Sequence, residues 1–181
     1  MKRKEFLKSS GLCGLCACAG LPVAAFASDK LDPEVKTLQR NIEFVHLRFA
    51  KLIDLLKHQL DIREMEALLE ELGRECSREF IPIYKNYKGD LDGFLKMCRR
   101  DWKMNCAHDP MARRVVTYGE KTGKCFCPFV DESRMSPVFC KCSLGWQKET
   151  FSAVIGKPVE AKILSSVLRG GRSCDFAVFY G

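Results

Sequence analysis

Cysteine is the residue type in this sequence with the greatest capacity for chemistry: there are 11 cysteines in 181 residues. Three lie before residue 20 and eight lie in the rest of the chain. Cys125 and Cys127 form one Cys-x-Cys pair, Cys140 and Cys142 form a second, and 12 residues separate the pairs. Thiolates are soft ligands that favour Zn²⁺ and iron–sulfur clusters over Mg²⁺ or Ca²⁺. Four converging sulfurs would therefore make a zinc or Fe–S site.

This metal-site hypothesis depends on how the two pairs are placed. On a β-strand, a spacing of two puts Cys125 and Cys127 on one face, and a segment folded back beside them would bring Cys140 and Cys142 close, with Cys174 as a further candidate ligand. Two alternatives stay open. The eight cysteines are an even number, so in an oxidising compartment they could cross-pair as disulfides. They could also remain reduced thiols.

An enzymatic use of the same thiols is a further alternative. Hydrolysis through a thioester needs a thiolate, a base and donors for an oxyanion. Cys140 or Cys142, near the start of a predicted helix, would have a lowered pKa and backbone N–H groups nearby. His108, in the run Cys106 to Asp109, is the candidate base, and it could equally be a metal ligand, a proton shuttle or a surface residue. The sequence contains no Ser-His-Asp signature and no phosphate-binding loop.

The elements that must position these residues begin with helices. Apolar residues recur at three- and four-residue steps, which predicts helices over residues 32–60, over 61–80 and from residue 90. Each predicted start has an acidic residue able to cap a helix: Asp32, Asp61 and Asp90. Cys76 and Cys98 lie on apolar helix faces, so we expect both to be core residues.

The second half of the sequence changes to a β pattern. Residues 113–118 and 124–130 predict a hairpin, a helix is expected from about Ser143 to Ile155, and two more strands are expected at 159–168 and 174–180. Helices followed by a β-β-α-β-β order predict an α+β fold, with an antiparallel sheet covered by helices on one side. Residues 28–181 would then be one domain, helical over 32–103 and sheet-forming over 113–181.

Residues 1–27 are typical of an export signal. Four basic residues precede a small, apolar stretch, and Ala25-Phe26-Ala27 suits cleavage before Ser28. The start resembles a twin-arginine signal, with Phe6-Leu7-Lys8 after Arg3-Lys4, although lysine replaces the second arginine. We expect the export machinery as a partner, a periplasmic or extracellular location and no stable membrane span after cleavage. A lipoprotein, through Leu15 to Cys18, and an uncleaved anchor are alternatives.

The segment from Cys140 to Phe179 resembles the 4-vinyl reductase domain. Gly156-Lys157-Pro158-Val159 follows the predicted helix as the Gly-x-Pro-Val motif does in that family, and the run from Gly170 to Phe176 contains its later glycine, cysteine and phenylalanine. The resemblance implies a small-molecule-binding domain, and a related group hydrolyses 2-amino-thiazoline-4-carboxylate. It therefore also implies, as an alternative, a hydrolase of thiazoline- or amide-like substrates.

The resemblance also bears on the metal. Sensory members of the family hold a structural zinc through three cysteines and a glutamate. Two of those positions fall on Cys140 and Cys174, and the other two fall on Ile163 and Ser166, which cannot serve as those ligands. The family zinc site is therefore lost here or rebuilt from other residues.

The charge of the chain excludes little but gives no support to nucleic-acid binding. The sequence has 30 Lys and Arg against 23 Asp and Glu, and residues 1–27 alone hold four of the basic residues and one acid. The mild surplus that remains does not predict a nucleic-acid partner. We expect an exported domain that binds an unknown small molecule and has a cysteine-rich structural site, with a hydrolase or an exported metal or Fe–S protein as alternatives.

Overall fold

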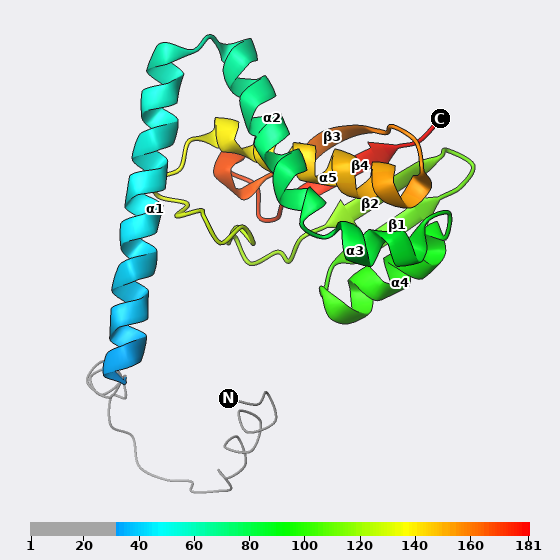
Figure 1. The fold of residues 1–181 in the computed structure, drawn as a ribbon, viewed down its shortest axis with the longest axis horizontal. Coiled ribbons are helices and arrows are strands. Elements are labelled where there is room, and N and C mark those ends of the chain that lie inside the picture. Colours follow the sequence, from blue (N-terminus) through cyan, green and yellow to red (C-terminus); the bar gives the residue numbers. More distant parts are fainter. Residues whose placement is uncertain (1–31) are drawn as a thin grey trace, which may run out of the picture. The chain divides into compact units, whose positions relative to one another are not determined.

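A computed structural model describes residues 32–181 of the chain (Figure 1). The predicted export signal, residues 1–27, lies outside the described residues. By its internal contacts the chain divides into residues 1–38 and residues 39–181, and the second unit contains the sheet and the helices around it. No helix within the described part is apolar over a stretch long enough to cross a bilayer.

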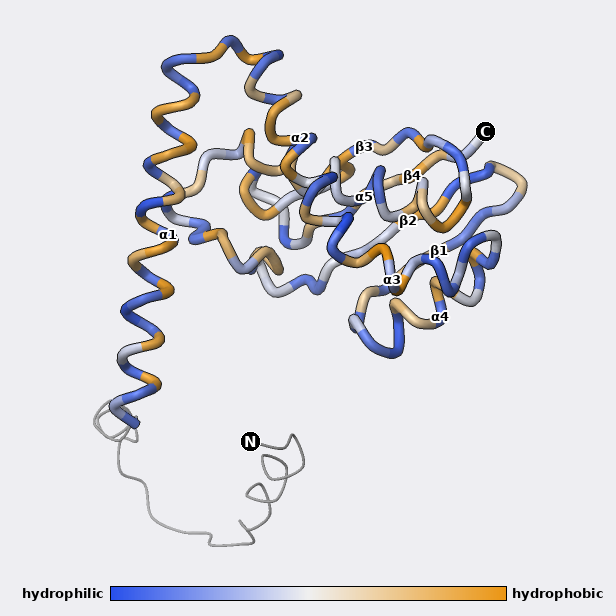
Figure 2. The backbone as a smooth tube through the Cα atoms, viewed as in Figure 1, coloured by the Kyte–Doolittle hydropathy of each residue, from blue (hydrophilic) through white to orange (hydrophobic). Residues whose placement is uncertain are grey.

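The predicted helices are confirmed. The helices before the sheet are α1 (Pro33–Gln59), α2 (Ile62–Arg78), α3 (Ile81–Tyr84), a short 3-10 turn (Lys85–Tyr87) and α4 (Leu91–Asp101). Asp61 caps α2, since its carboxylate accepts from the backbone N–H of Arg63 and Glu64 while the Glu64 side chain accepts from the Asp61 N–H. Along α1, hydrophilic and hydrophobic residues alternate in the manner of an amphipathic helix (Figure 2).

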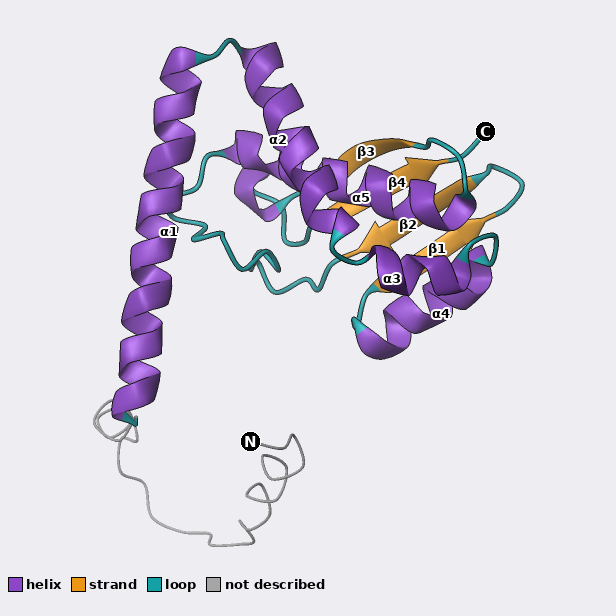
Figure 3. Ribbon diagram, viewed as in Figure 1, coloured by secondary structure: helices purple, strands orange, loops and turns teal. Residues whose placement is uncertain are grey.

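The remaining elements form an antiparallel sheet with one helix inserted between its two hairpins. They are β1 (Asn105–Asp109), β2 (Arg114–Tyr118), a 3-10 turn (Pro137–Phe139), α5 (Cys140–Ile155), β3 (Glu160–Ser165), a second 3-10 turn (Val167–Arg169) and β4 (Asp175–Phe179). The strand order is β1-β2-β4-β3, and each neighbouring pair is antiparallel. Helix α5 packs on β3 and β4 (Figure 3). The predicted α+β class and β-β-α-β-β order are confirmed.

The predicted hairpin between 113–118 and 124–130 is wrong. Strand β2 pairs with β1 on one edge and with β4 on the other, so neither edge is free for residues 124–130, which form an irregular loop. The turn that closes the real hairpin precedes β2: the Asp109 carboxylate accepts from the Ala112 N–H, and Arg113 takes a positive φ of 46°. Strand β1, which precedes this polar turn, was too short to be recognised as a strand from the sequence.

Two glycines bring α2 and α5 into backbone contact. A Cβ on Gly73 would lie 1.8 Å from the carbonyl oxygen of Cys142, and one on Gly145 would lie 1.8 Å from that of Glu70. No other residue has a side chain small enough for these two positions. The close approach fixes where the side chains on the next turns of α5 lie relative to α2.

Next to this contact, three buried hydroxyl groups satisfy one another. The Ser77 and Thr150 hydroxyl oxygens are 2.9 Å apart, and Thr150 donates to the Tyr84 hydroxyl at 3.1 Å. Ser77 lies 3.3 Å from the same Tyr84 oxygen. Burial raises the pKa of Tyr84 despite these hydrogen bonds, so the phenol stays protonated and available to the network.

Candidate functional site

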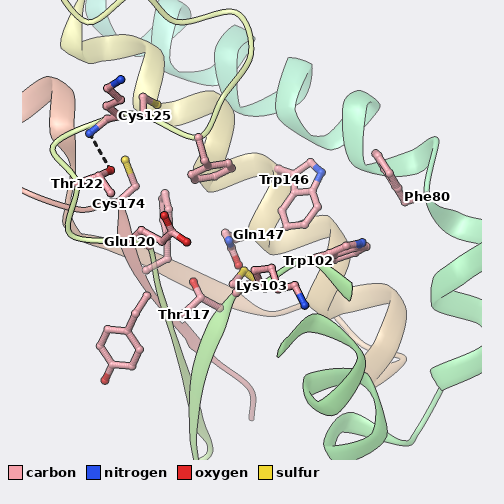
Figure 4. Close-up of a pocket in the computed structure, with 16 residues that line it drawn as sticks. Phe80, Trp102, Lys103, Thr117, Glu120, Thr122, Cys125, Trp146, Gln147 and Cys174 are labelled. Atoms are coloured by element: carbon pink, nitrogen blue, oxygen red, sulfur yellow. Dashed lines mark hydrogen bonds between the residues drawn. The ribbon is translucent and has the colours of Figure 1, made fainter. Parts of the chain in front are cut away.

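A cavity of about 680 Å³ lies between α5, the ends of β2 and β4, and the segment that follows α4. Its volume is in the range of small-molecule sites in proteins. Six aromatic residues contribute to the wall: Phe80, Trp102, Tyr118, Phe126, Trp146 and Phe176. Trp102 and Trp146 have ring centroids 5.8 Å apart and, with Phe80, form one end of the cavity (Figure 4).

The helix ends place these aromatic rings. Trp102 is the C-terminal cap residue of α4, and Lys103, with a positive φ of 54°, turns the chain from that helix into β1. Trp146 directly follows Gly145, so the backbone contact between α2 and α5 sets its position. The sequence pattern gave no signal that Trp102 would line a cavity.

Two polar atoms in the cavity wall are buried without a partner. Thr117 of β2 and Gln147 of α5 are each 2% exposed, and both line the cavity. Within the described residues, the Thr117 Oγ1 and Gln147 Oε1 atoms are the two buried side-chain oxygen or nitrogen atoms that have no hydrogen-bond partner. Leaving such a group unpaired costs about 1–3 kcal/mol. Because both atoms lie in one wall, a molecule bound in the cavity that hydrogen-bonds to them would remove this cost.

The opposite end of the cavity carries two thiols, Cys125 and Cys174 (Figure 4). Interaction with the Cys125 thiol lowers the pKa of Cys174, and the backbone of Val167 acts in the same direction, while burial, Asp175 and Glu132 oppose them. The same interaction, together with burial, raises the pKa of Cys125.

Three backbone hydrogen bonds hold the loop that carries Cys125. The Gly119 N–H donates to the Cys174 carbonyl at 3.1 Å, and the Gly123 N–H donates to the Arg172 carbonyl at 3.0 Å. The Cys125 N–H donates to a Glu132 carboxylate oxygen at 2.6 Å. The first two bonds tie the irregular loop to the segment before β4, and the third lies within the loop. They explain how Cys125 comes to line the same cavity as Cys174 although residues 124–130 form no strand.

The structure also brings the other predicted metal residues into one region. Electrostatic interactions link Cys127 to Cys140, Cys174 and Cys76, and link Cys142 to Cys127 and Cys76. All eight cysteines of residues 32–181 are free, and in that range no group of three or more His, Cys, Asp or Glu side chains is arranged to hold a metal ion. The zinc or Fe–S site stays a prediction.

The two cysteines that we expected in the core differ. Cys98 is fully buried, as predicted, but the prediction for Cys76 is wrong, because that residue is exposed. Cys76 lies on α2 one turn after Gly73, beside Cys142 and Cys127. The sequence pattern showed its apolar helix face but not which part of that face α5 leaves uncovered.

The expected lowering of the pKa values of Cys140 and Cys142 is also wrong. Burial raises both, that of Cys142 to about 12, and for Cys140 the nearby Ser166 and Arg169 do not offset the loss of solvent. The Cys140 sulfur lies 3.1 Å from the Ser166 hydroxyl. Two positions that the resemblance aligns with zinc ligands are therefore in contact, and Cys174, a third, is close enough to Cys140 to influence its pKa.

His108, the predicted base, lies on β1 and has its own partners. Its Nδ1 is 2.9 Å from an Asp92 carboxylate oxygen, and its Nε2 is hydrogen-bonded to the Tyr180 hydroxyl. Cys140 has Ser166 as its hydrogen-bond partner. The proposed base and nucleophile are therefore engaged with separate groups, and the hydrolase stays a prediction.

Comparison with known proteins shows a similar fold and no family. No protein-family model matches the chain, and no curated protein sequence matches it. Among solved structures, the chain is similar to trafficking protein particle complex subunit 3 from Naegleria fowleri. In that crystal structure the subunit is covalently bound to palmitic acid. The TM-score is 0.55 and the identity 11%, over 78% of this chain and 95% of that one. At this identity the likeness concerns the fold alone.

Proposed function

We propose that this protein binds a largely apolar small molecule in the cavity between α5 and the ends of β2 and β4. The observation that carries the proposal is the pair of unpartnered polar atoms, Thr117 Oγ1 and Gln147 Oε1, in the wall of an otherwise mainly apolar cavity. Ligand sites commonly combine apolar walls with a few polar groups that fix orientation. Burying these two groups without partners costs free energy in the isolated protein, and a ligand that hydrogen-bonds to them offsets that cost.

The wall also restricts the chemistry of the ligand. An amide oxygen only accepts hydrogen bonds, so Gln147 calls for a donor, whereas the Thr117 hydroxyl can donate or accept. The aromatic rings of Trp102 and Trp146 favour a flat or elongated apolar body. The expected ligand is therefore an aromatic or long-chain molecule with at least one N–H or O–H group near its middle.

The structural comparison supports an apolar ligand in a limited way. The similar trafficking subunit is covalently bound to palmitic acid, which shows that a protein of related fold accommodates a long apolar chain. The 4-vinyl reductase resemblance also implies small-molecule binding. Neither comparison selects the ligand of this chain, and the wall chemistry is the narrower guide.

The tryptophans allow a direct test. The chain has two tryptophans, Trp102 and Trp146, and both line the cavity. N-phenyl-1-naphthylamine is apolar and aromatic, has one N–H donor, and accepts excitation energy from tryptophan. We expect saturable energy transfer to this probe in the full chain. We expect Gln147→Leu to weaken probe binding about tenfold, because leucine has a similar volume but no hydrogen-bond acceptor.

A matched control separates this cavity from general surface adsorption. Gln59, at the end of α1, is not in the cavity wall, so Gln59→Leu should leave probe affinity unchanged. Circular dichroism should show that both variants retain the helix content of the parent chain. Absence of saturable transfer, or equal affinities of the parent and the Gln147→Leu variant, would overturn the proposal.

A further inference from the structure

The two unpartnered atoms of the cavity wall belong to groups whose chemistry narrows the choice of ligand. Thr117 lies on β2 and Gln147 on α5, and Figure 4 shows both side chains extending into the same part of the cavity. Each is 2% exposed, whereas Phe126 in the same wall is 64% exposed. The polar atoms therefore lie deep, while an aromatic ring of the wall faces solvent.

The neighbours of Thr117 in the sheet do not supply its missing partner. Cys106 of β1 and Phe176 of β4 pair with it directly, so all three side chains lie on one face of the sheet. The Cys106 thiol donates to the Met104 carbonyl at 3.6 Å, and a phenylalanine side chain has neither a donor nor an acceptor. Within residues 32–181, the Thr117 hydroxyl is thus left for a molecule in the cavity.

The Gln147 side chain calls for two kinds of ligand group side by side. Its carboxamide is planar, with an oxygen that only accepts hydrogen bonds and an NH2 group that only donates them on the same carbon. A ligand atom that donates to the oxygen therefore lies beside the NH2 group, which favours an acceptor at the next ligand position. Rotation of the amide by half a turn would exchange the two atoms, and the ligand would still need a donor next to an acceptor.

We propose that the cavity selects flat heterocycles with the cis-amide edge of a lactam, in which a ring N–H group is next to a ring carbonyl. The ring N–H donates to Gln147 Oε1, and the carbonyl oxygen, which has two lone pairs, accepts from the Thr117 hydroxyl and from the Gln147 NH2 group. One group on the ligand thus satisfies both unpartnered atoms. This inference rests on the proposed function, and it names the ligand class and assigns Gln147 as the residue that determines specificity.

The aromatic residues around this pair suit a flat ring. Trp146 precedes Gln147 in α5, and Trp102 lies against Trp146 with the two ring planes inclined at 58°. Such rings attract an aromatic body through offset or edge contacts. A bicyclic lactam fits inside a cavity of about 680 Å³ and would contact these rings while its polar edge lies at Gln147.

Two ligand groups that resemble a lactam would satisfy the wall less completely. A phenol has a single oxygen, which can donate to Gln147 Oε1 but leaves the Gln147 NH2 group without an acceptor in the plane of the ring. An N-methylated lactam retains the ring and the carbonyl, but its methyl group would meet the Gln147 oxygen where a donor is needed. The N-methylated compound is therefore the matched ligand control.

The test measures the affinities of three related compounds for the full chain by isothermal titration calorimetry. The compounds are 2-quinolinone, which has the lactam edge, 1-methyl-2-quinolinone, which lacks the donor, and 2-naphthol, which has one hydroxyl group. We expect 2-quinolinone to bind at least about tenfold more tightly than each of the others. Equal affinities for the two quinolinones, which water bound at the two oxygens would produce, would overturn the proposal, as would tighter binding of 2-naphthol.

Two variants assign the preference to individual side chains. Gln147→Leu should bring the ratio of the two quinolinone affinities close to one, because leucine cannot accept from the ring N–H. Thr117→Val should weaken both quinolinones about tenfold and keep their ratio, because both retain the carbonyl. Gln59→Leu, outside the cavity wall, should change neither affinity. A ratio that persists in Gln147→Leu would refute the role of Gln147, and the comparison in the parent chain stands even if a variant fails to fold.

The naphthylamine probe distinguishes this inference from the proposed function. N-phenyl-1-naphthylamine has an N–H group and no carbonyl, so its binding does not depend on recognition of a lactam edge. Saturable probe binding together with equal affinities for the two quinolinones would refute the lactam preference and leave the ligand site in place. Absence of binding by the probe and by all three compounds would refute the ligand site itself.

Discussion

The unpartnered hydroxyl of Thr117 allows an unusual stability prediction. Thr117 is 2% exposed on β2, and its Oγ1 has no hydrogen-bond partner in the protein. Thr117→Val replaces this hydroxyl with a methyl group of nearly the same size and retains a β-branched side chain, which suits a strand. The substitution should therefore stabilise the isolated protein, whereas most substitutions at buried positions destabilise.

The magnitude follows from the cost of an unsatisfied polar group. A buried hydroxyl without a partner costs about 1–3 kcal/mol, so its removal should raise the free energy of unfolding by about 1–2 kcal/mol. For a domain of this size, 1 kcal/mol shifts the midpoint of thermal unfolding by roughly 2–4 °C. Urea unfolding, followed by circular dichroism, measures the free energy, and a thermal scan checks the direction of the change.

Thr150→Val is the matched control. Thr150 is as deeply buried as Thr117, but its hydroxyl is hydrogen-bonded to Ser77 and Tyr84. The same substitution at this position should destabilise by about 1–3 kcal/mol, because it removes satisfied hydrogen bonds. Opposite signs at the two positions would support the reasoning. A loss of stability in Thr117→Val as large as that in Thr150→Val would refute it, since the Thr117 hydroxyl would then have a partner in the free protein.

Two further predictions concern the contact between α2 and α5. Gly73→Ala should destabilise the protein by about 1–3 kcal/mol in urea unfolding, because the new methyl group would meet the Cys142 carbonyl and force the helices apart; an unchanged midpoint would show that the helices do not approach so closely. Burial acts to raise the pKa of Glu70, but hydrogen bonds and charges of Lys148 and Arg74 outweigh it and hold that pKa below 4.5. The stability that this carboxylate contributes is therefore present above about pH 4.5, and it is lost as the pH falls through the lowered pKa. Glu70→Gln should therefore lose less unfolding free energy than the parent between about pH 6 and pH 3, and parallel pH profiles of the two proteins would contradict this assignment.

Part of the candidate site could be predicted from the sequence. Cys125 and Cys174 were both among the predicted metal ligands, and the structure places both in the wall of one cavity (Figure 4). The reasoning that joined Cys125 to its neighbours was nevertheless wrong, because it relied on a strand over residues 124–130. Thr117 and Gln147 had no signal, since a polar residue is recognised as unsatisfied only when everything around it is known.

The sequence by itself determined the longer helices of this protein. Periodic apolar residues define the helices, Asp61 caps α2, and Gly156, with a positive φ of 85°, ends α5. These outcomes depend on neighbours a few residues apart, whose influence is visible in a short window. The order of helices and strands then led to the α+β class.

Only the tertiary structure decided which strands pair and which side chains share the cavity. Strand β2 has two edges, and β1 and β4 occupy them. This pairing depends on how the whole chain packs, and the residues next to β2 in the sequence do not specify it. The cavity joins residues from the segment after α4, from β2, from α5 and from β4, and the contact of Gly73 with α5 fixes one of its walls. Burial, pairing and the pKa of a thiol depend on atoms distant in sequence, so the local pattern could not specify them.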